Sequence, residues 1–442
     1  MVLRTLALTL LGSLSLPAEP LPSGSALFIH PDGAGVNVWG AARFLKVGPD
    51  GLLAWDQLPE IGIYRGHVKD GLTPTSHAGA TCHAYGVKVA ADSYGMDLKK
   101  PLRALSGYPG SIMQEALARG KAVGLVNSGH IGEPGTGVFL ASVRKRKNVD
   151  AIASQILQSG AQVLLLGGEK FFLPEGVEGF HGPGARSDQR NLIEEARAAG
   201  YTIVFNRSQL QALDLPTVDK LLGIFATSDT YHAKSEELQA AEGLDHYEPE
   251  APTVAEMTEA ALTILSRHEK GFLLVTEEEG TDNFSNHNNA GGTMEAALRA
   301  DDALQIGLDF LQAHPDTLLL TCSDSDAGGL QIVSIAESLA RGYGGLPNLL
   351  ALDQLPMATT DNGAPMDGID GPQTAPFLSL PDRAGRRFPF GIAWAGKMDF
   401  SGGIAARAAG LHAERLPLNF DNTDTYRMLY LALFGEWLPH AE

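Results

Sequence analysis

Short apolar runs alternate with segments of helical periodicity along most of the chain. The runs are rich in leucine and β-branched residues, as expected of strands buried on both faces; they fall at residues 26–30, 122–129, 162–168, 202–206, 272–278 and 317–323. Amphipathic helices are predicted between them, each ending in a glycine that favours a left-handed cap, at 111–120, 150–160 and 189–200. Alternating strands and helices predict an α/β fold with a central, mostly parallel sheet flanked by helices on both faces.

This rhythm stops at about residue 342 and does not return until about 397. The stretch is dense in proline, glycine and aspartate, as in DNGAPMDGIDGPQTAPFLSLPDRAGRRFPFG, a composition that favours loops. We interpret 342–397 as a surface insertion or cap within a single domain that spans 21–442. No internal repeat or low-complexity tract divides the chain.

Residues 1–20 have the pattern of a secretory signal peptide. An early cation, Arg4, precedes an apolar run at 6–16, and small and turn-forming residues follow. The alternative is a buried N-terminal helix, which the prolines at 17–22 would end abruptly. Because no second apolar run of membrane-spanning length occurs, we expect an exported, soluble protein, periplasmic or extracellular, with no membrane partner.

The chain has an excess of acidic residues, with 52 Asp and Glu against 33 Lys and Arg and a net charge of −19. A field of this sign repels the nucleic-acid backbone, so no nucleic-acid partner is expected. It also opposes anionic substrates, unless bound cations offset it or a local arginine dominates. The two cysteines, Cys82 and Cys322, lie in apolar stretches and are predicted to be buried free thiols, with one disulfide between them as the alternative.

Acidic side chains stand where three of the predicted strands end. They are Asp32 at the first run, Glu277 and Asp282 with His287 at the fifth, and Asp324 at the sixth. In open α/β sheets, function gathers beyond the carboxyl ends of the strands. A single aspartate there is usually a helix cap or a turn residue, but several carboxylates with a histidine are typical of divalent-cation sites.

The stretch TPTSHAGATCHAYGVK, residues 73–88, places a serine where a helix of small residues begins. There the hydroxyl of Ser76 lies among free backbone N–H groups and at the positive end of the helix dipole, where a phosphate oxygen is stabilised. Ser76 is either an ordinary N-cap or a nucleophile. The second role requires a metal that lowers the pKa of its hydroxyl.

These segments together resemble the bacterial alkaline phosphatases, from about residue 26 to 340 and more weakly to 410. The resemblance implies that Ser76 is the serine that becomes phosphorylated. It also implies that Asp32, in HPDGAG, is a carboxylate shared between two metals. Thr75 departs from the pattern, because the family has an acidic residue just before the serine.

The segment EPGTGVFLASVRKR resembles the family's helix that presents the substrate-binding arginine. The matching residue is Arg146, and a bidentate guanidinium suits a phosphate dianion. Arg144 and Lys147 are assigned to a solvated face. Thr136, or alternatively Glu133, is implied as a ligand of the magnesium site.

The resemblance also assigns the acidic residues of the fifth run. Glu277 is implied as a magnesium ligand, with Glu278 and Glu279 as the competing choices. Asp282 and His287 are implied as zinc ligands.

Two further motifs depart from the family pattern. The family has a histidine directly after the aspartate that Asp324 matches, where this chain has Ser325 with Asp326 as a substitute. Near the C-terminus a histidine precedes a Thr-Gly pair, and this chain has Phe400 with Asp399 as the predicted substitute ligand. Oxygen ligands favour Mg²⁺, Mn²⁺ or Ca²⁺ over Zn²⁺, so we expect a harder cation at one zinc position.

The resemblance implies a metal-dependent phosphomonoester hydrolase with Zn²⁺ and Mg²⁺ as cofactors, a phosphoserine intermediate and an alkaline pH optimum. Its substrates would be small-molecule phosphate esters, and a homodimer is an open expectation. One alternative is a phosphodiesterase or sulfatase of the same superfamily; a sulfatase is disfavoured because Cys82 comes six residues after the nucleophile position. The other is a non-catalytic phosphate- or metal-binding protein of the same fold.

Overall fold

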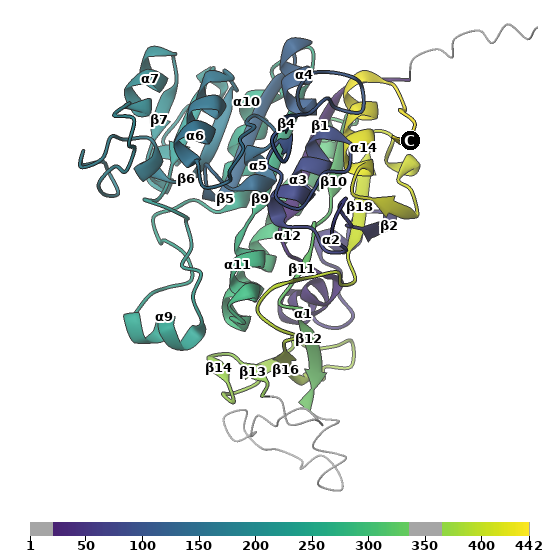
Figure 1. Ribbon diagram of the computed structural model, residues 1–442. Coiled ribbons are helices and arrows are strands. Elements are labelled where there is room, and N and C mark those ends of the chain that lie inside the picture. Colours follow the sequence, from purple (N-terminus) through teal and green to yellow (C-terminus); the bar gives the residue numbers. More distant parts are fainter. Residues whose placement is uncertain (1–20, 336–364, 442) are drawn as a thin grey trace, which may run out of the picture.

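A ten-stranded sheet forms the centre of the molecule in the part of the chain that the structure describes (Figure 1). The structure is a computed structural model and describes residues 21–335 and 365–441. The strands lie in the order β19 (Asn419–Asp421), β2 (Glu60–Arg65), β18 (Ala405–Gly410), β10 (Thr317–Thr321), β1 (Ser25–Pro31), β9 (Phe272–Glu278), β5 (Ala122–His130), β6 (Val163–Gly167), β8 (Leu221–Ile224) and β7 (Thr202–Val204). β18 is antiparallel to both of its neighbours, and the other pairs are parallel. The predicted α/β fold with a mostly parallel sheet is confirmed.

Helices cover both faces of this sheet. One core contains side chains of α3 (Ser76–Tyr85), α4 (Ile112–Ala118), α6 (Val149–Gln158), α7 (Leu192–Ala198) and α14 (Asp424–Phe434). The other contains those of α1 (Val36–Lys46), α2 (Ala54–Gln57), α8 (Arg207–Gln211), α10 (Val254–Leu265) and α12 (Ala290–Ala313). Along β1, Ala26 and Phe28 belong to the first core and Leu27 and Ile29 to the second. Both faces of the strand are therefore apolar, which explains its continuous hydrophobic run.

All six apolar runs form strands of this sheet, namely β1, β5, β6, β7, β9 and β10, and the three predicted helices correspond to α4, α6 and α7. The sequence pattern did not predict the other four strands. β8 has only four residues, and β18 reads AARAAG, whose alanines have little strand propensity. β19 is an edge strand, and β2 beside it alternates between exposed and buried positions.

A smaller sheet lies beyond the main one, at the lower end of Figure 1. It contains β12 (Gln331–Ser334), β16 (Pro389–Ala393), β13 (Asp367–Gly368), β14 (Gly371–Pro372) and β15 (Phe377–Leu378). It packs on α1, where the rings of Phe44 and Phe390 have centroids 5.6 Å apart. Residues 365–397 of the predicted insertion thus supply four of the five strands. Residues 342–364 lie outside the described residues, and the predicted domain boundaries stay a prediction.

Short elements follow the parallel strands at their carboxyl ends. α5 (Pro134–Gly137) follows β5, α11 (Gly280–Asn286) follows β9, and β11 (Asp326–Ala327) follows β10. β11 pairs with β17 (Asp399–Phe400), with Ala327 opposite Asp399, so a segment from near the C-terminus reaches the same edge. Other short elements include α9 (Glu236–Glu242), β3 (Met96–Asp97) and β4 (Lys100–Pro101).

Cys82 and Cys322 are buried and free, so they do not form the alternative disulfide. Burial raises the pKa of the Cys82 thiol to about 11 and that of Cys322 to about 12. Both thiols are therefore protonated at neutral pH and are poor nucleophiles.

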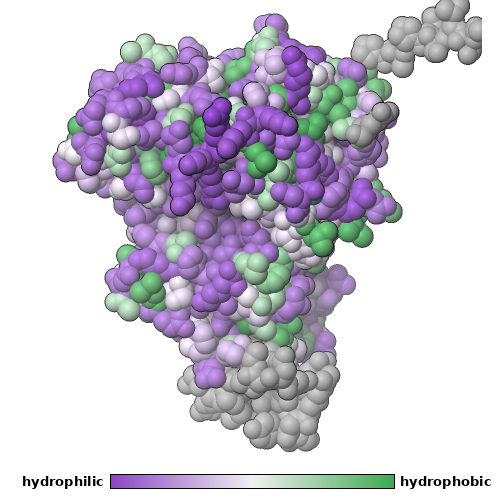
Figure 2. Space-filling view, in the orientation of Figure 1, coloured by the Kyte–Doolittle hydropathy of each residue, from purple (hydrophilic) through white to green (hydrophobic). Residues whose placement is uncertain are grey.

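The surface seen in Figure 2 is mostly hydrophilic, with apolar side chains in small separate groups. Within residues 21–335 and 365–441, no helix combines the length and the apolar character needed to cross a membrane. The predicted signal peptide at 1–20 lies outside the described residues.

Glu236 links α9 to the start of α12. Its Oε1 atom accepts hydrogen bonds from the backbone N–H groups of Ala290 (2.7 Å) and Gly291 (3.1 Å). Its Oε2 atom is buried and has no hydrogen-bond partner within the described chain. Burial raises the pKa of Glu236 to about 8, although the two N–H groups oppose the shift.

We predict that Glu236→Gln stabilises the protein at alkaline pH. The unfolded carboxyl group has its ordinary pKa of 4.5, so between 4.5 and about 8 the folded state binds the additional proton and the free energy of unfolding falls as the pH rises. Glutamine retains the acceptor oxygen and cannot ionise. The variant should therefore gain on the order of 1 kcal/mol at about pH 9 and little at about pH 5, as measured by urea unfolding. Glu242→Gln, at the exposed end of α9, is the control, and equal gains at both pH values would contradict the prediction.

Candidate active site

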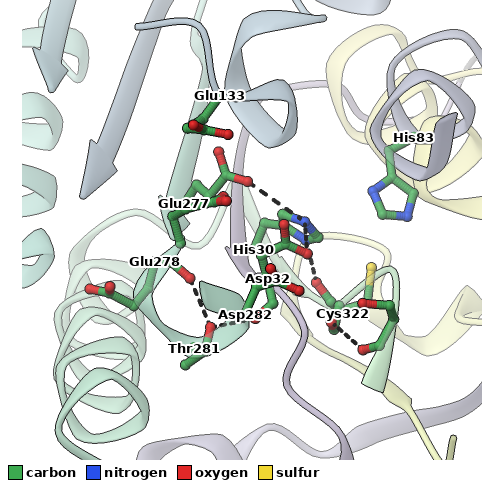
Figure 3. A network of polar contacts seen from close by, with 12 residues as sticks. His30, Asp32, His83, Glu133, Glu277, Glu278, Thr281, Asp282 and Cys322 are labelled. Carbon is green, nitrogen blue, oxygen red and sulfur yellow. Dashed lines mark hydrogen bonds and ion pairs between the residues drawn. The ribbon is translucent and has the colours of Figure 1, made fainter. Parts of the chain in front are cut away.

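Buried carboxylates gather at the carboxyl ends of β1, β9 and β10 (Figure 3). Each is at most 6% exposed; they are Asp32, Glu277, Glu278, Glu279, Asp282 and Asp324. Strand pairing explains the clustering, because the register of β1 and β9 places His30 opposite Glu277. The backbone N–H of Asp32 then donates to the carbonyl of Glu278 over 3.1 Å. Neighbouring parallel strands thus deliver acidic side chains to one edge of the sheet.

Asp32 belongs to two groups of closely spaced ligand atoms. Atoms of His30, Asp32 and Asp324 lie within 4.8 Å of one another, and so do atoms of Asp32, Glu277 and Glu279. Both Asp32 carboxylate oxygens are buried, and neither accepts a hydrogen bond from the described residues. The carboxylate therefore lies where it can contact two cations, the role that the family resemblance implies for it.

The three successive glutamates at the end of β9 have different surroundings. Glu278 turns away from Asp32 and accepts hydrogen bonds from Ser128 Oγ (2.7 Å) and Tyr247 Oη (2.8 Å). Glu277 and Glu279 turn toward Asp32. Of the two competing choices for Glu277, the structure therefore brings only Glu279 into the cluster.

One amide links Glu277 to Thr136. Nδ2 of Asn127, in β5, donates to Glu277 Oε2 and, over 2.8 Å, to Thr136 Oγ1 in α5. A Cβ atom at Gly135 would lie 1.7 Å from Glu277 Oε1, so only a glycine lets α5 approach this closely. The structure thus brings Thr136 and Glu277 together. The sequence analysis missed Asn127, whose one signal is that it is polar within a buried apolar run.

Asp282 and Asp399 face each other across the amide of Asn286. Nδ2 of Asn286 donates to Asp282 Oδ2 over 3.0 Å and to Asp399 Oδ1 over 2.9 Å. Asn286 follows Asp282 by one turn of α11, so the two share a helix face. The structure does not bring the predicted ligand His287 into this group: its side chain is exposed, and Nδ1 lies 2.7 Å from the backbone oxygen of Asn283. The helical spacing from Asp282 could have identified Asn286, which a search for histidine passes over.

Asp324 lies against the backbone of α3. A Cβ atom added to Gly79 would lie 2.6 Å from Asp324 Oδ2. Both Asp324 oxygens and the hydroxyl of Ser325 are buried without a hydrogen-bond partner in the described chain. Asp326, the substitute considered for the missing histidine, abuts Gly402 instead.

Ser76 is the first residue of α3, and the N-cap is Thr75. The hydroxyl of Thr75 donates to the backbone oxygen of Ala91 and does not cap the helix. Ser76 and Gly79 are three residues apart on α3 and share a face, which is the face turned to Asp324. The structure therefore places Ser76 at the open end of the helix, on the side of the carboxylates.

Arg146 lies on a loop after α5, not on a helix as expected, because α5 ends well before it. Its Nη2 atom is 2.9 Å from Glu133 Oε2, and Glu133 Oε1 is 2.9 Å from His130 Nε2. Glu133, the alternative to Thr136 as a magnesium ligand, thus holds the guanidinium. Arg144 and Lys147 are exposed, in agreement with a solvated basic face.

Burial raises the pKa of most acids in the cluster, and neighbouring carboxylates add to the shift. Asp32 is the exception, because His30 lowers its pKa to about 2 against the effect of burial. Burial raises the pKa of Glu277 to about 8; His30 opposes the shift and Asp32 adds to it. Burial and neighbouring carboxylates also hold the pKa of Asp282 and of Asp324 well above the usual range. Buried carboxylates without hydrogen bonds are costly unless a cation offsets their charge. Oxygen donors with one imidazole fit divalent cations.

A profile of the family described as alkaline phosphatase matches residues 26–342 of the chain. The chain belongs to the alkaline phosphatase family. The match covers the segments that contain Asp32, Ser76, Arg146 and Asp324. It ends before Asp399, in the region where the sequence resemblance weakens.

Two relatives illustrate how far the chain resembles known alkaline phosphatases. The membrane-bound alkaline phosphatase of Bombyx mori is 27% identical over 329 residues, which are 66% of this chain and 58% of that protein. The alkaline phosphatase of Escherichia coli strain K12 is 26% identical over 351 residues, 71% of this chain and 72% of that protein. The chain thus spans little more than half of the length of the first relative.

Solved alkaline phosphatase structures have the same fold. The enzyme of Thermus thermophilus superposes with a TM-score of 0.69 at 20% identity, covering 96% of this chain and 95% of that one. The cold-active enzyme of Shewanella sp. gives 0.67 at 23% identity, covering 92% and 99%. A variant of the TAB5 alkaline phosphatase with Mg bound in its M3 site gives 0.67 at 17% identity, covering 93% and 99%.

We predict that Gly79→Ala weakens cation binding while the alkaline phosphatase fold is retained. Alanine favours a helix by about 0.8–1 kcal/mol over glycine, but the new methyl group must displace Asp324. Loss of one well-placed group near a metal typically costs about 10- to 100-fold in affinity. Competition with a chromogenic chelator would measure this loss.

The matched control is Gly40→Ala in α1, where the nearest atom to the new Cβ is Cδ1 of Ile332 at 3.1 Å. This variant gains the same helix propensity at a distance from the carboxylates. Wild-type cation affinity in Gly79→Ala would contradict the close approach of α3 to Asp324.

Proposed function

We propose that the chain is a metal-dependent phosphomonoester hydrolase that acts at alkaline pH through a phosphoserine at Ser76. The observation that carries this proposal is the position of Ser76 at the N-terminal end of α3, on the face whose Gly79 abuts Asp324. A helix N-terminus stabilises anionic oxygen, and the carboxylates beside it are suited to binding cations. Membership of the alkaline phosphatase family supports this class of reaction.

Divalent cations are part of this proposal. Asp32 and Asp324 would hold one cation, and a second would lie at Asp282 and Asp399. A third would lie at Glu277 and Thr136; these are the residues assigned to the magnesium site. Cations at such positions lower the pKa of a bound hydroxyl and stabilise charge on a transferring phosphoryl group.

The proposed cofactors are Zn²⁺ at the first two positions and Mg²⁺ at the third, by resemblance to the family. The solved TAB5 variant with bound Mg supports a magnesium site in this fold. The carboxylate oxygens of Asp282 and Asp399 favour a harder cation, Mg²⁺, Mn²⁺ or Ca²⁺, at the second position. His287 stays a proposed ligand there, and it would have to turn inward from its exposed position.

The chain's own residues would carry out two displacements at phosphorus. In the first, Ser76 Oγ loses its proton to solvent and forms a bond to phosphorus while the ester P–O bond breaks; the departing alkoxide takes a proton from water. In the second, water attacks the phosphoserine, the Oγ–P bond breaks, and inorganic phosphate leaves as Oγ regains a proton. Arg146 would hold the phosphoryl oxygens bidentately, and Glu133 would position its guanidinium.

The proposal includes the location of the enzyme and its partners. Residues 1–20 support export to the periplasm or beyond the cell, where the substrates would be small-molecule phosphate esters. A homodimer belongs to the proposal by resemblance to the family, and sedimentation of the purified protein would measure it.

Removal and return of metals should switch hydrolysis off and on. A chelator should abolish turnover of nitrophenyl phosphate at alkaline pH, and Zn²⁺ with Mg²⁺ should restore it. Mg²⁺, Mn²⁺ or Ca²⁺ should replace one zinc equivalent, because carboxylate oxygens form the second position. If no cation restores turnover in folded protein, the non-catalytic alternative replaces the proposal. Faster hydrolysis of the bis-nitrophenyl diester would favour a phosphodiesterase.

Ser76→Ala should remove the covalent route. Loss of a catalytic nucleophile typically lowers kcat by on the order of 10³-fold or more, and no acid-stable phosphate should remain on the variant after a quench with labelled substrate. Ser208→Ala, an exposed serine on α8, is the control and should behave as wild type. Undiminished turnover or labelling in Ser76→Ala would rule out this serine as the nucleophile.

A further inference from the structure

His30 lies fully buried at the end of β1, in the middle of the carboxylate cluster (Figure 3). The sequence analysis did not select it, although it stands two residues before Asp32. Its Nδ1 atom is 2.8 Å from the backbone oxygen of Cys322. A carbonyl oxygen can only accept a hydrogen bond, so Nδ1 must carry a proton. In the neutral ring the lone pair is then on Nε2.

The Nε2 atom of His30 is buried and has no hydrogen-bond partner in the described chain. It lies 3.4 Å from Asp32 Oδ1 and 3.9 Å from Glu277 Oε1. A charge-assisted bond from a protonated imidazole would be about 2.7–2.9 Å long. These two separations fall within ion-pair range but are longer than such a bond. Ligand atoms of His30, Asp32 and Asp324 thus lie within 4.8 Å of one another without a close direct bond from Nε2.

The hydrogen bond to Cys322 is typical of a histidine that binds a metal. Such histidines almost always donate the second ring N–H to a carbonyl or carboxylate, which fixes the tautomer and the orientation of the ring. The same link joins β1 to the residue just after β10, two positions before Asp324. One backbone contact thus orients His30 and helps to hold the segment that delivers Asp324.

A second buried histidine nearby differs in this respect. The rings of His30 and His83 have centroids 5.5 Å apart, but His83 Nε2 is 2.7 Å from Tyr64 Oη. His83 also lies outside every group of close ligand atoms found among the described residues. It is therefore a matched comparison, a buried imidazole beside the cluster that is not placed to join a ligand set.

We propose that His30 is a metal ligand and completes a site of one nitrogen and two carboxylates with Asp32 and Asp324. Imidazole with carboxylates suits Zn²⁺. His30 would thus supply, from β1, the imidazole that Ser325 lacks after Asp324. The two neighbouring positions then differ in chemistry, because Asp282 and Asp399 offer carboxylate oxygens, whereas this group adds an imidazole nitrogen to its carboxylates.

The inference rests on the proposed function only for the part that this zinc site would play in hydrolysis, since metal binding itself is measured without substrate. Purified protein would be stripped with a chelator, loaded with limiting Zn²⁺ alone, and studied by zinc titration and zinc K-edge X-ray absorption. The wild type should show imidazole scattering around zinc. His30→Gln should lose that scattering and bind zinc more weakly by more than the roughly 10- to 100-fold that an outer-shell partner costs.

His83→Gln should keep the wild-type zinc affinity and spectrum, since its ring is engaged by Tyr64. His287→Gln should also keep the imidazole scattering. That result would support the proposal even if His30→Gln does not fold. Wild-type zinc without imidazole scattering would overturn the proposal. So would scattering that persists in folded His30→Gln or disappears in His287→Gln.

The two proposals can fail separately. Zinc bound through His30 in a protein that hydrolyses no phosphate ester would keep this inference and remove the proposed function. Full hydrolysis with unchanged zinc binding in His30→Gln would keep the proposed function and remove this inference.

Discussion

The burial of several carboxylates at one edge of the sheet is the constraint on which the rest of this structure depends. Asp32, Glu277, Asp282 and Asp324 are together and almost without solvent contact, an arrangement that costs free energy in the folded protein. It persists because a ten-stranded sheet with two apolar cores fixes the strand ends that carry them. The packing of the sheet and its two cores thus offsets the free-energy cost of the site, as strained functional sites require.

Side-chain amides and glycines around the cluster serve this constraint. Asn127 and Asn286 each donate to two acidic or hydroxyl groups that have no other donor among residues 21–335 and 365–441. Gly79 and Gly135 let helix backbone approach carboxylates more closely than any other residue allows. These four residues contribute no charge, and yet they determine how tightly the acidic groups are held. Their role is positioning, which mutational scans of ionisable residues alone would overlook.

Much of the fold could be predicted from the sequence, because strands buried on both faces leave continuous apolar runs. β1, β9 and β10 were found in this way, whereas the alanine-rich β18 and the half-exposed β2 carried no such signal. Within the site, the sequence could predict four carboxylates because they stand at or just after strands with continuous apolar runs; these are Asp32, Glu277, Asp282 and Asp324. His30 and Asn286 were not selected. The neighbours of His30 become clear only from the register of β1 and β9, and those of Asn286 only from its position one helical turn after Asp282 on α11.

The position of β1 has a consequence for the order in which the protein can form. This strand is central, yet its partners are β9, which begins at Phe272, and β10, which begins at Thr317. Contacts so distant in sequence slow folding, since a long loop must close before they form. A chain leaving the ribosome would have to produce most of its length before its first strand could pair. During that delay β1 would stay unpaired, and its apolar side chains would be exposed until β9 and β10 were made.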